Sequence, residues 1–222
     1  MSLSKVLITG SSKGLGYYLA KHFASKGHSI IIHGRNKKRL ERVNEEIKKI
    51  GTESEYFISD LANISEIIDF SNFALKKNVK ILINNAGVTC PNKPFKEIDN
   101  NIIKRMIDVN ITAPIMLINF LKDNLEQVIN INSMSGIESK KNRTIYAATK
   151  WGLRGFSESL KKEKNLYGIL DVYPTNIRTW PERENAMNVD LVVNKIYGSM
   201  ISKDKELILD GRINDYWENK IY

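Results

Sequence analysis

Short apolar stretches alternate with longer amphipathic stretches along most of the chain. The apolar stretches predict strands, several of them rich in valine, isoleucine and leucine on both faces, as in a buried parallel sheet. They are Val6–Thr9, Ser29–His33, Glu55–Ile58, Lys80–Asn84, Gln127–Asn132, Gly168–Val172 and Glu206–Leu209. Helical patterns lie between them, near residues 14–26, 37–50, 63–77, 98–124, 146–164 and 188–202. The alternation predicts right-handed crossovers and a doubly wound α/β fold of about seven parallel strands, with helices on both faces.

Length and composition are those of one ordinary globular domain. The chain has 222 residues, 42% hydrophobic and 27% charged, which fits a single domain over residues 1–222. No apolar run approaches the roughly 18 residues that span a membrane, and no signal-peptide pattern precedes the first strand. Cys90 is the only cysteine, and the three histidines are scattered. We therefore expect a cytoplasmic protein without a disulfide, a membrane segment or a metal site.

The chain is strongly basic, with a formal net charge of +9. Nucleic acid is one class of partner for such a protein. The lysines, however, are spread along helical stretches such as Asn36–Lys49 and Lys161–Lys164, without an arginine-rich tail or an aromatic RNA-binding motif. This distribution favours a solvated basic surface that attracts phosphate-bearing small molecules, and we expect no nucleic-acid partner.

The first strand runs into a glycine-rich turn that opens a helix. The turn reads Thr9-Gly10-Ser11-Ser12-Lys13-Gly14-Leu15-Gly16. Glycines allow close approach of the backbone to a pyrophosphate, and a helix N-terminus offers free N–H groups and a favourable dipole. A purely structural turn is the alternative. The predicted cofactor contacts here are Gly10, Ser12, Lys13, Gly14, Leu15 and Gly16.

The end of the second strand bears on the choice of dinucleotide. A site for NAD usually has a carboxylate at this point, which bonds the ribose hydroxyls. Here the strand ends in His33-Gly34-Arg35-Asn36, without an acid. Arg35 is suited to pair with a 2′-phosphate, and Lys13 adds a second positive charge. The pattern favours NADP(H) over NAD(H), although both cations would also suit an ordinary surface.

Three polar residues further along form a candidate proton-transfer site. Tyr146 and Lys150 are four residues apart and share one face of the predicted helix. A lysine ammonium one turn away favours the phenolate form of a tyrosine. Ser133, at the end of a predicted strand, can hold a substrate oxygen beside them. A tyrosine and lysine at this spacing also occur by chance on many helices.

With these motifs in their order along the chain, the sequence resembles the short-chain dehydrogenase/reductase family over nearly its whole length. The resemblance rests on the glycine turn, Asp60-Leu61, Asn84-Asn85-Ala86-Gly87, Asn110, Ser133 and the Tyr146/Lys150 pair. It implies a Rossmann-like domain that transfers a hydride between nicotinamide and a carbonyl or alcohol substrate. It also implies a homodimer or homotetramer. A dinucleotide-binding sensor with little catalysis is the alternative function.

The resemblance also implies a role for each matching residue. Tyr146 matches the general acid or base and Ser133 the hydroxyl that polarises the substrate oxygen. Lys150 matches the lysine that binds the nicotinamide ribose, and Asn110 the asparagine that kinks its helix and holds a water in a proton relay. The remaining matches are cofactor contacts: Asp60 and Leu61 at the adenine, Asn85, Ala86 and Gly87 at the adenosine ribose, and Pro174, Ile177 and Thr179 after the sixth strand.

The sequence departs from the family pattern in two places. Thr175 stands where the family usually has glycine after Pro174. If that position requires a positive φ, Thr175 is strained or the turn differs. The segment from about 180 to 188 is also short for a lid over the substrate, which predicts an open or shallow pocket or one completed by another subunit. The aromatic tail, about 211–222, is a candidate cover for the site or for a neighbouring subunit, and the alternative is packing against its own subunit.

Overall fold

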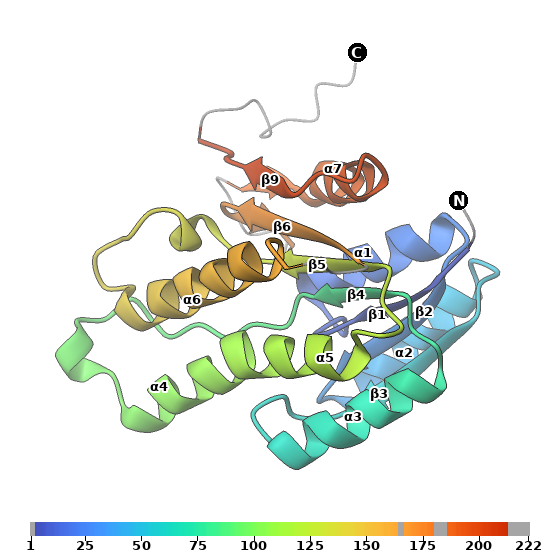
Figure 1. Ribbon diagram of the computed structural model, residues 1–222, viewed down its shortest axis with the longest axis horizontal. Coiled ribbons are helices and arrows are strands. Elements are labelled where there is room, and N and C mark those ends of the chain that lie inside the picture. Colours follow the sequence, from blue (N-terminus) through green and yellow to red (C-terminus); the bar gives the residue numbers. More distant parts are fainter. Residues whose placement is uncertain (1–2, 164–166, 180–185, 213–222) are drawn as a thin grey trace.

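A seven-stranded parallel sheet forms the centre of the computed structural model, which describes residues 3–163, 167–179 and 186–212 (Figure 1). Its strands are β1 (Lys5–Ile8), β2 (Ser29–Gly34), β3 (Ser54–Ile58), β4 (Ile81–Asn84), β5 (Gln127–Ile131), β6 (Gly168–Pro174) and β9 (Glu206–Leu209). Their order is β3-β2-β1-β4-β5-β6-β9, and every neighbouring pair is parallel. The predicted α/β fold and strand count are therefore confirmed. The strand order reverses direction between β1 and β4.

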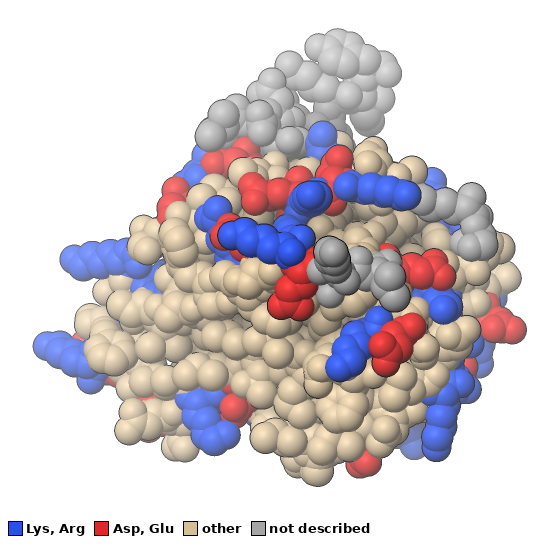
Figure 2. All heavy atoms as spheres, in the orientation of Figure 1, with Lys and Arg blue, Asp and Glu red and all other residues tan. Residues whose placement is uncertain are grey.

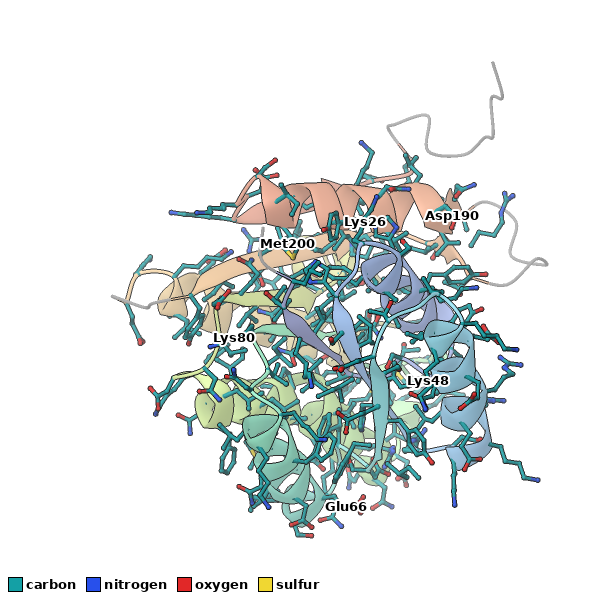
Figure 3. All side chains as sticks on the ribbon, turned by 90° about the vertical axis from the view of Figure 1, so that its right-hand side faces the viewer. Lys26, Lys48, Glu66, Lys80, Asp190 and Met200 are labelled. Carbon is teal, nitrogen blue, oxygen red and sulfur yellow. The ribbon has the colours of Figure 1, made fainter. Side chains whose placement is uncertain are left out.

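Helices cover both faces of this sheet. They are α1 (Gly14–Ser25), α2 (Lys37–Lys48), α3 (Ile64–Lys76), α4 (Asn100–Ile107), α5 (Ala113–Leu121), α6 (Thr144–Leu160) and α7 (Val189–Ile201). One hydrophobic core joins the sheet to α1, α2 and α7, and a second joins its other face to α3, α5 and α6. Figure 3 shows α7 lying across α1, with Met200 turned toward the first core and Asp190 at the outer start of α7.

The apolar pattern located the long elements well but missed three short features. The predicted helix over 98–124 is divided by a π-helical segment, Asp108–Thr112, between α4 and α5. Two residues on either side of the 180–185 segment form a small parallel pair, β7 (Ile177–Arg178) with β8 (Met187–Asn188). Short 3₁₀ turns occur at Phe95–Glu97 and Met134–Gly136. These features have too few residues to show a hydrophobic period.

A row of buried polar side chains crosses the second face of the sheet. The Asn84 amide donates to Asn130 Oδ1 at 2.9 Å, and Asn130 in turn donates to Ser157 Oγ at 2.9 Å and to Asp171 Oδ1 at 3.2 Å. The Asp171 side chain is fully buried, and its other oxygen accepts from Lys161 Nζ at 2.6 Å. The interpretation of Lys161 as part of a solvated basic face is therefore wrong. It neutralises a buried acid that no sequence period reveals.

Most of the other described charged side chains lie at the surface. On the face shown in Figure 2, basic and acidic side chains are interspersed, and a broad area carries neither. Exposed apolar side chains include Ile102 and Ile107 on α4 and Trp151 on α6. None of the described helices has the length and apolar character needed to cross a membrane.

Replacing Lys161 by methionine should destabilise the fold strongly. The change leaves the Asp171 carboxylate buried without a counter-ion, and we expect the free energy of unfolding to fall by about 3 kcal/mol. Urea denaturation followed by circular dichroism measures it. Asp171→Asn added to this variant should restore part of the loss. The control is Lys162→Met at the next, exposed position. Equal urea midpoints for the two single variants would contradict the assignment.

Candidate functional site

The carboxyl ends of the strands open into two adjoining cavities. The larger, about 610 Å³, lies beyond β5 and β6 and contains Ser133, Tyr146 and Lys150 in its wall. The smaller, about 330 Å³, lies over the glycine turn after β1. Four residues line both cavities: Leu15, Asn85, Gly87 and Val88. The two cavities therefore form one elongated site along the sheet edge, at the point where the strand order reverses.

Tyr146 and Lys150 come from the first turns of α6. Lys150 is only 4% exposed, and its ammonium donates to the carbonyl oxygen of Ile131 at 3.0 Å. The same ammonium lies 5.8 Å from the centre of the Tyr146 ring. Burial lowers the pKa of Lys150, and the neighbouring Tyr146 opposes that shift. The end of β5 therefore fixes the lysine beside the tyrosine before any ligand is bound.

Ser133 lies at the turn that follows β5. Its backbone is extended, and its Oγ accepts a hydrogen bond from the Ser135 N–H at 3.1 Å. This bond occupies an acceptor position of the hydroxyl and leaves its proton to be directed elsewhere. The hydroxyl lines the same cavity as Tyr146, so both groups can address one substrate oxygen.

Asn110 lies behind this wall, within the π-helical segment. Its side chain accepts from the Val88 N–H at 2.8 Å, donates to the Val88 carbonyl at 2.9 Å and donates to Thr149 Oγ1 at 3.1 Å. Asn110 is 2% exposed and is not among the described residues that line either cavity. It ties the segment after β4 to α6. Asn110 lies in the π segment that interrupts the helix, while the kink and a part in a proton relay stay predictions.

The smaller cavity is built for close approach to the backbone. Gly10 has a φ of 65°, and a Cβ there would lie 2.9 Å from the Ala86 Cα. Gly16 is pressed against Gly10 and the Asn85 side chain, so it shapes the turn without lining the cavity. The start of α1 has no side-chain cap and no acid in its first turn, whereas an Asn or Asp caps α2, α3, α4 and α7. Its free N–H groups fit a diphosphate.

Thr9 joins the glycine turn to the segment after β4. Its Oγ1 accepts from the N–H groups of Asn85 and Ala86 at 3.0 and 2.9 Å. The Asn85 amide donates back to the carbonyl oxygens of Thr9 and Gly10, at 2.8 and 3.2 Å. The predicted contacts Asn85, Ala86 and Gly87 are thus held against the cavity by bonds between two strand ends.

Arginines surround Asp60 at the far end of the smaller cavity. Nη2 of Arg105 lies 3.0 Å from both oxygens of Asp60, and Arg35 Nη1 lies 3.7 Å from Oδ2. Partial burial acts to raise the pKa of Asp60, but the Ala62 N–H and the two guanidinium groups hold it below its ordinary value. Lys13 and Leu61 line the same cavity. Two guanidinium groups thus contact one carboxylate in a cavity that Lys13 also lines, and Arg105 is a cation that the sequence motifs did not reveal.

His33 supports the glycine turn from inside the protein. Its Nδ1 accepts from the Gly10 N–H at 3.2 Å, so the ring proton is on Nε2, which donates to the Ser59 carbonyl at 3.1 Å. The ring also stacks on Phe70. Burial lowers the pKa of His33 to about 4. A neutral imidazole therefore shapes the turn, because protonation of Nδ1 would remove the acceptor for Gly10.

The end of β6 completes the larger cavity with Pro174, Ile177 and Thr179. The strain considered for Thr175 is absent, since positive φ outside glycine occurs among the described residues only at Asn78, Asn142 and Lys203. The Thr175 N–H donates to the Leu209 carbonyl, and its Oγ1 accepts from the Gly211 N–H, both at 2.9 Å. The threonine therefore connects β6 to the segment after β9, which a glycine could not do through a side chain.

Several lining residues were not anticipated. They are Lys140, Lys141, Arg143 and Arg212. A signal was present in the first three, which form a basic run shortly before Tyr146. Arg212 gave no local signal, because the pairing of β9 with β6 brings it to the site. The predicted lid, about 180–188, lies outside the described residues except for residues 186–188. The predicted tail, about 211–222, lies outside them beyond Arg212.

The fold and this elongated site define the class of α/β dinucleotide-binding oxidoreductases. A family model described as short chain dehydrogenase matches residues 4–186. An uncharacterized oxidoreductase of Staphylococcus epidermidis is 31% identical over 172 residues, covering 73% of this chain and 72% of that protein. Short-chain dehydrogenase/reductase 3 of Homo sapiens is 30% identical over 179 residues, covering 77% of this chain and 57% of that protein.

Solved structures agree with this assignment. The bulky-bulky ketone specific alcohol dehydrogenase from Comamonas testosteroni has a TM-score of 0.86 at 27% identity, covering 94% of this chain and 86% of that chain. A short-chain dehydrogenase from Sphingobium yanoikuyae, in complex with NADPH, has a TM-score of 0.83 at 26% identity, covering 93% of this chain and 87% of that chain. This chain belongs to the short-chain dehydrogenase/reductase family.

The neutral state of His33 predicts a loss of stability in weak acid. Its pKa in the folded protein, about 4, lies below the ordinary 6.5. Between these values the unfolded chain binds more protons than the folded one, so stability falls as pH falls. We expect a loss of about 2 kcal/mol in the free energy of unfolding between about pH 7 and about pH 5, measured with urea.

The matched variant is His33→Asn, whose amide oxygen can accept from Gly10 but does not titrate. His22 and His28 also have lowered pKa values and contribute in the same direction. The variant should therefore show a smaller, nonzero pH dependence. A pH dependence equal to that of the unchanged protein would disprove the role assigned to His33.

Proposed function

We propose that this protein is an NADP(H)-dependent dehydrogenase or reductase that interconverts a carbonyl and an alcohol, with Tyr146 as the general acid or base. The observation that carries the proposal is the convergence of Ser133, Tyr146 and Lys150 on one cavity that continues into the glycine turn. Membership of an oxidoreductase family and likeness to ketone-acting and NADPH-bound neighbours support it.

Each protein group has a defined task in the proposed reaction. The Ser133 hydroxyl donates to the substrate oxygen and stabilises the negative charge that grows there during reduction. The Tyr146 hydroxyl gives its proton to the same oxygen, and takes it back in the oxidation. Lys150 keeps positive charge next to Tyr146 and is placed to bond the ribose of the dinucleotide. The bound nicotinamide supplies or accepts the hydride.

The dinucleotide would be held along the smaller cavity. The candidate diphosphate contacts are Gly10, Ser12, Lys13, Gly14 and Leu15, all of which line it. Asp60, Leu61, Asn85, Ala86 and Gly87 line the same cavity and would contact the adenosine half. The cations Lys13, Arg35 and Arg105 exceed the single carboxylate of Asp60. This surplus favours a 2′-phosphate, and therefore NADP(H) over NAD(H).

A dinucleotide-binding sensor without catalysis is the second candidate. The departure from the family pattern at Thr175 gives this candidate no support, because that residue makes regular hydrogen bonds to the Leu209 carbonyl and the Gly211 N–H. The aligned Ser133, Tyr146 and Lys150 favour the enzyme, because binding alone does not require a proton donor. NADPH binding without turnover over a broad panel of ketones and aldehydes would favour the sensor.

Replacing Tyr146 by phenylalanine should abolish most turnover while leaving cofactor binding in place. The ring still packs against Lys150, but the proton donor is gone, and we expect kcat to fall by about 10²–10⁴. Oxidation of NADPH is followed by absorbance with a panel of ketones, and NADPH affinity by fluorescence. An active Tyr146→Phe variant would rule out the proton-transfer role.

Replacing Arg35 by alanine should weaken NADPH binding selectively. A lost charge-assisted contact to phosphate corresponds to about ten- to hundredfold in Kd, while the Kd for NADH should change little. Fluorescence titration with both cofactors measures the ratio. Arg42→Ala, an exposed arginine of α2 that pairs with Glu46, is the control. An equal loss for NADPH and NADH would contradict phosphate recognition by Arg35.

A further inference from the structure

Among the described residues, the charged side chains that line the larger cavity are all positive. Among the described residues in its wall, every ionisable side chain other than Tyr146 is a lysine or an arginine. They are Lys140, Lys141, Arg143, Lys150 and Arg212. Lys150 is buried beside Tyr146. The other four are not buried and lie on the 137–143 loop and at the end of the described chain.

Two of these four cations are neutralised within the protein. Arg212 forms a forked pair with Asp210, with Nε 2.8 Å from Oδ1 and Nη2 2.6 Å from Oδ2. Glu138 lies 2.6 Å from Arg212 and 3.2 Å from Lys140. The two acids thus balance Lys140 and Arg212, and both acids have lowered pKa values because of the Arg212 guanidinium. These ion pairs connect the 137–143 loop to Arg212, the last described residue.

Lys141 and Arg143 make no ion pair with any described residue. Arg143 immediately precedes α6, and its guanidinium lies 5.5 Å from the centre of the Tyr146 ring. The start of α6 has no side-chain cap, so its first N–H groups and its dipole add to the positive potential there. Positive charge at a cavity wall that no described acid balances favours an anionic ligand.

We propose that the substrate carries a carboxylate or phosphate group, which Lys141 and Arg143 bind while Ser133 and Tyr146 hold its carbonyl or alcohol oxygen. The inference rests on the proposed function, because it assigns the reacting oxygen to Ser133 and Tyr146. Arg143 suits a planar or multivalent anion through its forked donors, and Lys141 adds a mobile point charge. Binding the anion at one end orients the substrate along the cavity.

Matched pairs of ketones that differ only in charge test the proposal. One pair is 4-oxopentanoate and its methyl ester, and the other is dihydroxyacetone phosphate and dihydroxyacetone. With NADPH at low salt, the anionic member of at least one pair should have a kcat/KM about tenfold higher or more. The pair that shows the preference distinguishes carboxylate from phosphate. Equal kcat/KM within both pairs would overturn the proposal.

The double variant Lys141→Gln/Arg143→Gln assigns the preference to these side chains. Its kcat/KM for the anionic ketone should fall about tenfold toward that of the neutral partner, which itself should change little. Lys162→Gln, at the opposite end of α6, should keep the preference. A preference that survives in the double variant would overturn the proposal, as would loss of neutral-ketone turnover to the same extent.

A binding measurement separates this inference from the proposed function. Calorimetry with the NADP⁺-loaded protein should show binding of 4-oxopentanoate or dihydroxyacetone phosphate that weakens with salt and is lost in the double variant. If neither ketone of a pair is turned over but the anion binds in this way, the proposed function fails and the anion site stands. If turnover occurs without any charge preference and no anion binds, the proposed function stands and the anion site fails.

Discussion

The site depends on the common direction of the seven strands. In a parallel sheet the carboxyl ends of all strands lie at one edge, so turns that are far apart in the sequence meet there. The glycine turn after β1, the Asn85 segment after β4, Ser133 after β5 and Thr175 after β6 are all brought together in this way. Hydrogen bonds between these strand ends, such as those of Thr9 with Asn85 and of Lys150 with Ile131, then hold the turns in place.

Buried polar groups place further constraints on the fold. His33 must stay neutral to accept from Gly10, and Asp171 requires Lys161. Groups of this kind destabilise a fold when their partners are removed, because a buried donor, acceptor or charge is left without its counterpart. His33 itself lines the smaller cavity and fixes the glycine turn, whereas Asp171 and Lys161 join β6 to the end of α6 and line neither cavity.

The long elements and the central residues were predictable because each carries a local signal. Strand and helix periods located the sheet, and Gly10, Ser133, Tyr146 and Lys150 sit in short motifs whose order is itself informative. The π segment around Asn110 was harder to predict from the sequence, because Asn110 is held by Val88 and Thr149 from other parts of the fold. Two ion-pair groups were likewise hard to predict, because they join elements that meet only in the folded chain. They are the pair of Arg105 with Asp60, and the Arg212–Asp210 pair with Glu138.

The distribution of charge over the protein was the property least predictable from the sequence. Spread over 222 residues, a charge of +9 indicated a general basic surface. In the structure, the charges that bear on function are those left unbalanced within the site: Arg35, Arg105 and Lys13 against Asp60 in one cavity, and Lys141 and Arg143 beyond the Glu138–Arg212–Asp210 network in the other. Local compensation, which only the fold determines, decides where an anion is attracted, because a paired charge contributes little at a distance. Among the described side chains both cavities thereby carry an excess of positive charge, and Tyr146, the proposed proton donor, lines the larger one.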